Sequence, residues 1–324
     1  MKKTLLLALA GLVACAGAAS AQDFPQKGRP ITFVVPSTAG GGADTAARLL
    51  APLLEKDLGV PVEVVDKPGA SMQIGLGYVA TAKPDGQTIA LLVLPTAASG
   101  YLDAERKSPF GRSSLTPIGL YYGAPFGIVV RSESPFKTLK DVVDAAKANP
   151  GKVKAGTSGF MATGHFAVLA FENGTGTKVA TVNFQGGGPQ LTALMGGHTD
   201  VSMNSIGELV TQYKSGALRI LAVMGDKRDP NLPDVPTVAE AGFPNVEPIG
   251  SDIGLAAPAG TPKAVVDRLS LALKTSMEDP GLKARMTEFG NTLTYLPPAE
   301  YAAFWDKVDT RFKPLIDAAR KQGQ

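Results

Sequence analysis

Two glycine-rich stretches of this chain each follow an apolar, β-branched run and precede a helical pattern. They are PSTAGGGAD, residues 36–44, and GTSGFMATGH, residues 156–165. The start of a helix leaves backbone N–H groups without partners and carries a partial positive charge. Glycines before it let a ligand approach those amides closely. Together the two stretches favour an anion site built from backbone donors, although a plain strand-to-helix turn would account for either one alone.

The residues next to the glycines in the sequence argue against a nucleotide as the anion. No Lys follows the first stretch, so the phosphate-binding P-loop pattern is missing. Gly75-x-Gly77-x-x-Ala80 imitates a dinucleotide fingerprint, but it lies inside a helical pattern, and we interpret it as helix packing. Asp44 is expected to cap its helix or to hold the loop through backbone amides, leaving other amides free.

The residue types argue against catalysis. Ser158 lies in Gly-Thr-Ser-Gly, but residue 160 is Phe, so the Gly-x-Ser-x-Gly elbow fails. His198 follows two glycines and fits a turn, whereas His165 either donates to a ligand or serves its own loop. No paired base and no metal-ligand cluster is visible. We therefore predict a protein that is not an enzyme and that needs no cofactor and no metal.

The first residues form an export signal. Lys2 and Lys3 precede an apolar run over residues 4–14, and small residues lead to Ala21. That run is too short to cross a bilayer, so residues 1–21 are predicted to be a signal peptide and the protein to be periplasmic. A second interpretation stays open, in which Cys15 is lipidated as in bacterial lipoproteins. Cleavage at Ala21 would remove the single cysteine and with it any disulfide.

Composition and charge fit an ordinary globular protein. The 324 residues are 44% hydrophobic and 19% charged, and this length suits about two domains. Without Lys2 and Lys3, the 32 basic residues become 30 against 29 acidic ones, a net charge of +1. No basic tract is present, so nucleic acid is excluded as a partner.

Apolar β-branched runs alternate with helical patterns along the rest of the chain, which indicates parallel α/β sheets. Thr138 and Asp141 have the spacing of a capping box, and Thr261-Pro262 suits another helix start. The expected strands are 31–35, 62–65, 88–94, 127–131, 153–155, 179–183, 201–204 and 218–224, and the expected helices include 43–58, 74–82 and 138–149.

Several motifs together resemble a known family. They are Val35-Pro36 through Gly40-Gly41-x-x-Asp44 with Ala47-Arg48, Lys67-Pro-Gly-Ala70, Pro84-Asp-Gly86, Pro150-Gly-Lys152, residues 218–244 and residues 256–262. This set resembles the substrate-binding proteins of tripartite tricarboxylate transporters, the TctC-like or Bordetella uptake-protein family. The resemblance covers residues 25–320.

The resemblance implies a periplasmic binding protein of type II, with two α/β lobes and a ligand cleft between them. Lobe 1 would comprise 22–124 plus 248–324, and lobe 2 would comprise 125–247. It implies that a small organic carboxylate is captured and handed to a membrane permease of one large and one small subunit. A membrane sensor kinase is an alternative partner, to which the protein would present its ligand. An exported hydrolase is the alternative function from a different functional class.

The resemblance also implies the ligand-binding residues and narrows the ligand. Phe160 stands in the usual small polar loop, Gln185 where the family commonly has Lys, and Asp252 at a position that is frequently aromatic. The lost Lys and the gained Asp would make the cleft less basic, while Phe160 and Phe184 would make it more apolar. We therefore expect a ligand with one carboxylate and an apolar, aromatic or amine-bearing remainder. The implied contacts are Ser37, Thr38, Ala39, Gly40, Asp44, Gln73, Thr96, Ser158, Thr163, His165, Phe184, Gln185, Asn204 and Asp252.

Overall fold

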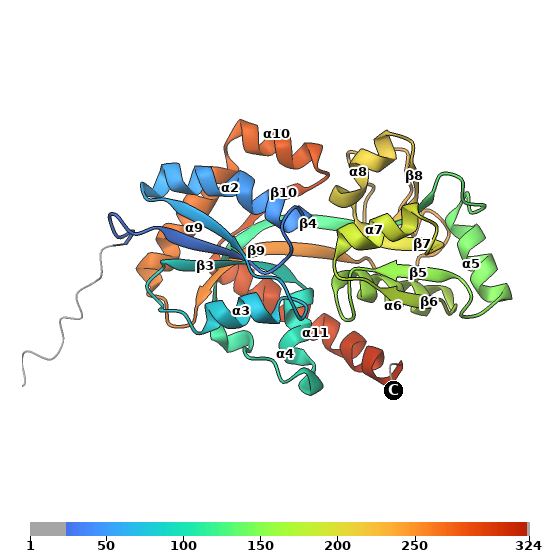
Figure 1. Ribbon diagram of the computed structural model, residues 1–324, viewed down its shortest axis with the longest axis horizontal. Coiled ribbons are helices and arrows are strands. Elements are labelled where there is room, and N and C mark those ends of the chain that lie inside the picture. Colours follow the sequence, from blue (N-terminus) through green and yellow to red (C-terminus); the bar gives the residue numbers. More distant parts are fainter. Residues whose placement is uncertain (1–23, 323–324) are drawn as a thin grey trace, which may run out of the picture.

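The computed structural model describes residues 24–322, which form two α/β lobes lying side by side (Figure 1). The predicted signal peptide 1–21, with Cys15, lies outside the described residues. None of the helices within residues 24–322 combines the length and the apolar character that a membrane span requires.

The first lobe is built on a sheet that is parallel at one edge, over β2, β1 and β3, and antiparallel beyond β3. Strand β1 pairs in parallel with β2 on one side and with β3 on the other. The other edge of β3 pairs with β9 in the antiparallel direction. The strands are β1 (Ile31–Val35), β2 (Val62–Asp66), β3 (Thr88–Leu94), β9 (Gly250–Pro258) and β10 (Thr292–Leu296). The helices are α2 (Gly42–Leu58), α3 (Gln73–Ala80), α4 (Thr96–Leu102), α9 (Lys263–Met277), α10 (Pro280–Glu288) and α11 (Pro298–Gln322).

The second lobe repeats the plan on a smaller sheet. Strand β5 lies between β6 and β7 and is parallel to both. Its strands are β5 (Lys154–Thr157), β6 (Ala180–Asn183), β7 (Val201–Ser205) and β8 (Leu218–Val223). Its helices are α5 (Leu139–Ala148), α6 (Thr163–Thr175), α7 (Gly187–Met195) and α8 (Ile206–Lys214).

One long strand, β4 (Leu115–Arg131), runs through both lobes (Figure 1). Up to Pro125 it pairs with β9, and from Phe126 onward it pairs with β7 and β8, always in antiparallel direction. The prediction of parallel sheets is confirmed for β1–β3 and β5–β7, but it missed the antiparallel strands β4, β8, β9 and β10, and the expected strand 127–131 is only the end of β4. The change of partner lies beside the predicted lobe boundaries, which themselves stay a prediction.

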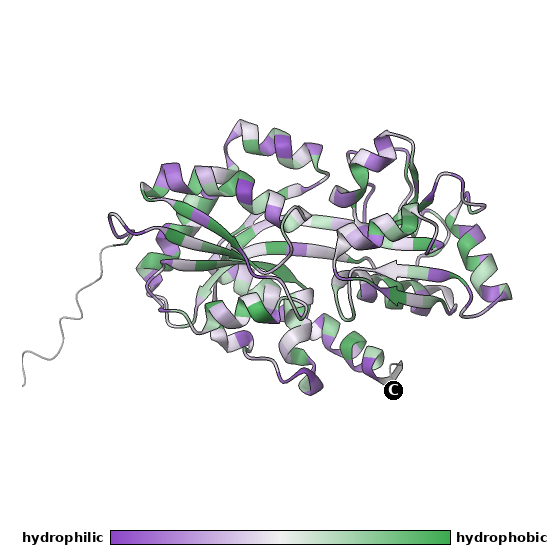
Figure 2. Ribbon diagram, viewed as in Figure 1, coloured by the Kyte–Doolittle hydropathy of each residue, from purple (hydrophilic) through white to green (hydrophobic). Residues whose placement is uncertain are grey.

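Hydrophobic residues are frequent along the strands, which Figure 2 colours largely green. The largest fully buried side chains include Phe33 on β1, Tyr121 on β4, and Tyr301 and Trp305 on α11. The indole Nε1 of Trp305 donates to the hydroxyl of Tyr101 at 2.6 Å, so the last helix is fixed to α4 by packing and by a partly buried hydrogen bond. This contact places α11 next to the residues that enter the cleft.

Two local predictions are confirmed. Thr138 Oγ1 accepts from the amide of Asp141 at 3.2 Å, and the Asp141 carboxylate accepts from the amide of Thr138 at 2.9 Å, which is a capping box at the start of α5. Gly75 and Gly77 are packing glycines on α3, because an added Cβ would lie 2.7 Å from Pro36 Cβ and 2.8 Å from Pro109 Cγ, respectively.

Candidate ligand-binding cleft

A cleft of about 1050 Å³ lies between the lobes. Its walls come from the loops that follow strands: 36–42 after β1, 68–72 after β2, 158–162 after β5 and 185–186 after β6. Ligands of open α/β sheets bind outside the carboxyl ends of the strands, where such loops meet. The two glycine-rich stretches noted in the sequence thus face one another across one space.

The first loop presents backbone donors because Asp44 holds it from behind. The carboxylate of Asp44 is 3% exposed, accepts from the amide of Gly40 at 2.7 Å and pairs with Arg48 Nε at 2.6 Å. Among the described residues, the amides of Thr38 and Ala39 meet no protein acceptor, and Ser37 Oγ is buried without a partner. The expected role of Asp44 in holding the loop is confirmed, and free donors remain for a ligand.

The second loop is supported by His165. Met161 lies in the left-handed region at φ 59°, and its amide donates to His165 Nδ1 at 3.0 Å. Burial, with Arg106 nearby, lowers the pKa of His165 to about 4, so the ring is neutral at neutral pH. Of the two roles considered for His165, the structure shows the one within its own loop.

Three buried hydroxyls connect the two lobes at the base of the cleft. Thr163 Oγ1, at the start of α6, lies 3.0 Å from Thr96 Oγ1 and accepts from Ser251 Oγ at 3.1 Å. Thr96 Oγ1 also accepts from the amide of Thr163 at 3.1 Å, so the first lobe supplies a partner for the first amide of a second-lobe helix. A hydroxyl cluster of this kind offers both donors and acceptors to a polar ligand.

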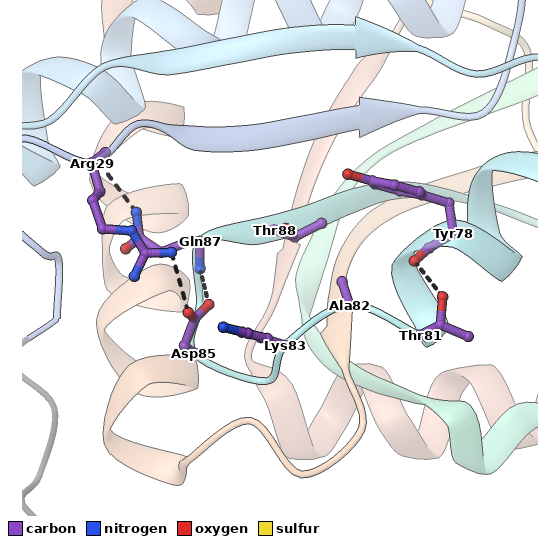
Figure 3. Close-up of a pocket in the computed structure, with 8 residues that line it drawn as sticks. All are labelled: Arg29, Tyr78, Thr81, Ala82, Lys83, Asp85, Gln87 and Thr88. Carbon is purple, nitrogen blue, oxygen red and sulfur yellow. Dashed lines mark hydrogen bonds and ion pairs between the residues drawn. The ribbon is translucent and has the colours of Figure 1, made fainter.

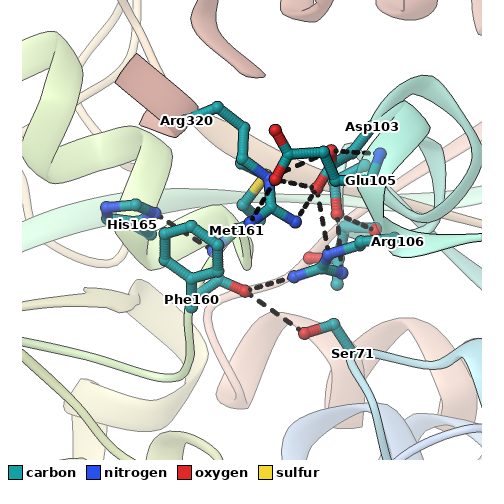
Figure 4. A network of polar contacts seen from close by, with 10 residues as sticks. Ser71, Asp103, Glu105, Arg106, Phe160, Met161, His165 and Arg320 are labelled. Carbon is teal, nitrogen blue, oxygen red and sulfur yellow. Dashed lines mark hydrogen bonds and ion pairs between the residues drawn. The ribbon is translucent and has the colours of Figure 1, made fainter. Parts of the chain in front are cut away.

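Two formally charged side chains occur among the described residues that line the cleft, Arg106 and Glu208. The guanidinium of Arg106 is 11% exposed and donates from Nη2 to the carbonyl oxygen of Phe160 at 2.8 Å, across the cleft (Figure 4). Asp103 lies 3.5 Å from Arg106 Nε and binds Arg320 of α11 at 2.6 Å. Burial lowers the pKa of Arg106, and Asp103 opposes that shift.

Neither charged residue was found from the sequence. Arg106 lies in a short charged turn that resembles any exposed loop, and only its Asp-x-x-Arg spacing from Asp103 is a signal. Glu208 lies in the first turn of α8, four residues after Asn204 of β7, and the strand-to-helix turn between them hides this proximity from helical periodicity. The Nδ2 atom of Asn204 donates to Glu208 Oε2 at 2.9 Å.

The structure brings most of the predicted site residues together around the cleft. The ones that line it are Ser37, Thr38, Ala39, Gly40, Gln73, Thr96, Ser158, Thr163 and Gln185. The ones that do not line it are Asp44, His165, Phe184, Asn204 and Asp252. For the second group, ligand contact stays a prediction, and the structure shows protein neighbours instead, such as Gly156 beside the Phe184 ring.

Asp252 on β9 lies against α11 and not in the cleft wall. Burial raises the pKa of Asp252 to about 6, and Arg311 opposes the shift. Its charge also contributes to the raised pKa of Tyr301. Asp252 therefore does not line the cleft, contrary to the expectation that it makes the cleft less basic. The acidic residue that lines the cleft is Glu208.

Replacing Asp252 with Asn is expected to stabilise the fold at pH 8 by up to about 3 kcal/mol, at about 1.4 kcal/mol for each unit by which folding raises the pKa. A carboxyl whose pKa is raised on folding costs stability when it ionises, and this cost begins above the unfolded pKa and is complete above about pH 6. At pH 4 wild type and Asp252→Asn should be equally stable. Urea unfolding at both pH values checks this, and an equal difference at both would contradict it.

A second, smaller pocket of about 340 Å³ lies on the outside of the first lobe (Figure 3). Its polar groups already serve one another: Gln87 Nε2 donates to the carbonyl oxygens of Arg29 and Pro30 at 3.1 and 3.0 Å, and Arg29 lies 3.5 Å from Asp85. The cleft between the lobes, where donors remain unpaired, is the better candidate site.

Two α/β lobes joined by crossing strands, with amides and hydroxyls of both lobes facing one cleft, define a solute-binding protein of the periplasmic type. A family model described as the tripartite tricarboxylate transporter family receptor matches residues 46–320. The chain belongs to this family, as the motifs of the sequence indicated.

Individual relatives agree over nearly the whole length. A UPF0065 protein in the gbd 5′ region of Cupriavidus necator is 34% identical over 307 residues, covering 95% of this chain and 92% of that protein. MatC from Rhodopseudomonas palustris with bound malate has a TM-score of 0.83 at 28% identity, covering 90% and 100% of the two chains. An R. palustris protein with adipate has a TM-score of 0.83 at 26% identity, covering 92% and 98%.

Proposed function

We propose that this protein is an exported receptor that captures a small organic carboxylate between its lobes and delivers it to the two-subunit permease of a tripartite tricarboxylate transporter. One observation carries the proposal. The starts of α2, α6 and α7 lie at the same cleft, and within residues 24–322 the amides of Thr38 and Ala39 and the buried hydroxyl of Ser37 have no partner. Helix starts with free donors suit an anion.

The energetics suit a carboxylate without a strong ion pair. Four to six charge-assisted hydrogen bonds at roughly 1.5–3 kcal/mol each give about 6–18 kcal/mol. Loss of ligand freedom costs at least about 4 kcal/mol. A micromolar dissociation constant requires about −8 kcal/mol, which the remaining free energy supplies. The malate and adipate held by the two structural neighbours support a carboxylate ligand.

Binding without turnover is supported by the environment of Ser158. His165, the nearest histidine in the sequence, uses Nδ1 to accept from the amide of Met161. A general base for Ser158 would need a free ring nitrogen to take up the proton of its hydroxyl. In the neutral ring of His165, Nδ1 is occupied by this hydrogen bond and Nε2 carries the proton, so neither nitrogen is free. We therefore propose a receptor and not a hydrolase, and an ester or amide that is hydrolysed by wild type but not by Ser158→Ala would contradict this.

The test starts from protein purified gently from the periplasm as residues 22–324. Native mass spectrometry is expected to show an extra mass that denaturation releases and that corresponds to a small acid. Calorimetry with citrate, malate, adipate and aromatic monocarboxylates should then give micromolar binding for at least one acid. If no acid is released and no carboxylate binds, the proposed function is wrong.

A further inference from the structure

Glu208 brings a negative charge into a cleft that is otherwise suited to an anion. It lies in the first turn of α8 and lines the cleft with Gly207, Thr211 and Gln212. Its carboxylate packs on the backbone of Gly187, the first residue of α7, where an added Cβ would lie 2.5 Å from Glu208 Cδ. The absence of a side chain at Gly187 therefore provides the space for this carboxylate.

A chain of buried hydrogen bonds fixes how Glu208 is contacted. Gln190 Nε2 lies 2.9 Å from the carbonyl oxygens of Gly156 and Met203, so its NH₂ group faces them. Ser202 Oγ then donates to Asn204 Oδ1 at 2.7 Å. This leaves the NH₂ group of Asn204 to donate to Glu208 Oε2 at 2.9 Å. Asn204 is 1% exposed, so its orientation is held by protein alone.

Both neighbours of the Glu208 carboxylate favour its ionised form. The Asn204 amide donates to it, and the start of α7 places a partial positive charge beside it. Burial acts in the opposite direction and raises the pKa of Glu208. A cation brought next to the carboxylate would remove this penalty, because an opposite charge favours the ionised form.

No cation of the described chain supplies that charge. None of the ion pairs within residues 24–322 involves Glu208. Arg106, the other charged residue of the cleft, is engaged with Asp103 and with the carbonyl oxygen of Phe160. Glu208 is half-buried and accepts from Asn204, but among the described residues it has no cationic partner, so a positively charged ligand group would offset its desolvation.

We propose that Glu208 binds a positively charged group of the solute, so that the solute is a zwitterion with its carboxylate at the glycine-rich loops and its cation at Glu208. This rests on the proposed function and names the class of solute within it. Phe126, Tyr122 and Ile253 line the same cleft and give a short apolar spacer a surface to contact. The inference thus selects the amine-bearing class among the ligands expected from the sequence.

The test compares probes that differ only in one end group. Succinate is paired with 3-aminopropanoate, glutarate with 4-aminobutyrate, and adipate with 5-aminopentanoate, so each pair shares its methylene spacer. Calorimetry on the exported protein gives the ratio of the two dissociation constants for each pair. In wild type the amino acid of at least one pair is expected to bind at least about tenfold more tightly than the diacid.

Glu208→Gln keeps the shape of the side chain and removes its charge, so the preference should fall by at least about tenfold. Gly187→Ala keeps the charge but occupies the space beneath it, and should also reduce the preference. Glu63→Gln is the control, because Glu63 is exposed on β2 and outside the cleft. Melting temperatures near that of wild type show that each variant is folded.

The outcomes separate the two proposals. An unchanged ratio in Glu208→Gln, or diacids that bind more tightly than amino acids in wild type, overturns the role of Glu208 and leaves a carboxylate receptor standing. Absence of binding by every probe and every acid overturns the proposed function itself. A preference for amino acids that is lost in Glu208→Gln and kept in Glu63→Gln supports the zwitterion.

Discussion

Asp103→Ala is expected to lower the free energy of unfolding by about 3 kcal/mol. The carboxylate of Asp103 is 2% exposed, binds Arg320 through two nitrogens at 2.6 and 3.0 Å and lies 3.5 Å from Arg106 (Figure 4). Its removal leaves the buried Arg106 without its acid and next to a second guanidinium. Such an uncompensated buried charge is far costlier than the loss of an exposed pair.

Urea unfolding at pH 7.5 measures this effect, and Glu105→Ala provides the matched control. Glu105 contacts the same Arg320 at 3.3 Å, but its side chain is 56% exposed, so a loss below about 0.5 kcal/mol is expected. If the free energy of unfolding falls by the same small amount in both variants, Asp103 does not compensate the buried charge of Arg106, which contradicts this prediction.

Gly75→Ala is expected to destabilise the fold by about 2–3 kcal/mol and to weaken ligand binding at least about tenfold. The added Cβ would lie 2.7 Å from Pro36 Cβ, 2.8 Å from the carbonyl oxygen of Lys67 and 2.9 Å from Pro36 Cα. Two of these atoms are backbone, so helix α3 or the loop after β1 must move. Pro36 begins the loop that presents the free amides, and a shift there misplaces the donors.

Calorimetry with the tightest-binding probe of the six, together with urea unfolding, measures both parts. Gly77→Ala on the same helix is the control, because its Cβ would meet the Pro109 ring and not the ligand loop. It should lose stability and keep its affinity. Equal affinities of Gly75→Ala and wild type would show that the position of α3 does not set the geometry of the loop.

Much of the fold was visible in the sequence because the parallel strands carry their own local signal. β1, β2 and β3 are short Ile- and Val-rich runs bounded by Gly or Pro, and the structure has them within a residue of the prediction. The first part of β4 has no such signal. It contains Pro117, Gly119 and Pro125, and its register shifts twice against β9, so pairing with distant strands determines its conformation.

The site was predictable where local sequence determines backbone geometry. The glycines and Asp44 of the first loop lie within nine residues, and their mutual contacts follow from that spacing. Arg106 and Glu208 reach the cleft only because strands far apart in the chain place them there. A charged residue in a turn or a helix is ordinarily solvated, and apart from the spacing of Arg106 from Asp103 no local pattern distinguishes these two from the other charged residues.

Because β4 runs without interruption from one lobe into the other, the connection between the lobes resists bending elastically. Phe126 donates to Ile249 and accepts from Met224, and Gly127 pairs with both β7 and β8, so the strand is bonded on both sides just beyond the crossing. A change in the angle between the lobes must bend these hydrogen-bonded strands, because the described chain has no flexible linker at this crossing. We therefore expect such a displacement to be shared among many small distortions of these strands, and the strands to favour the resting angle when no solute is bound.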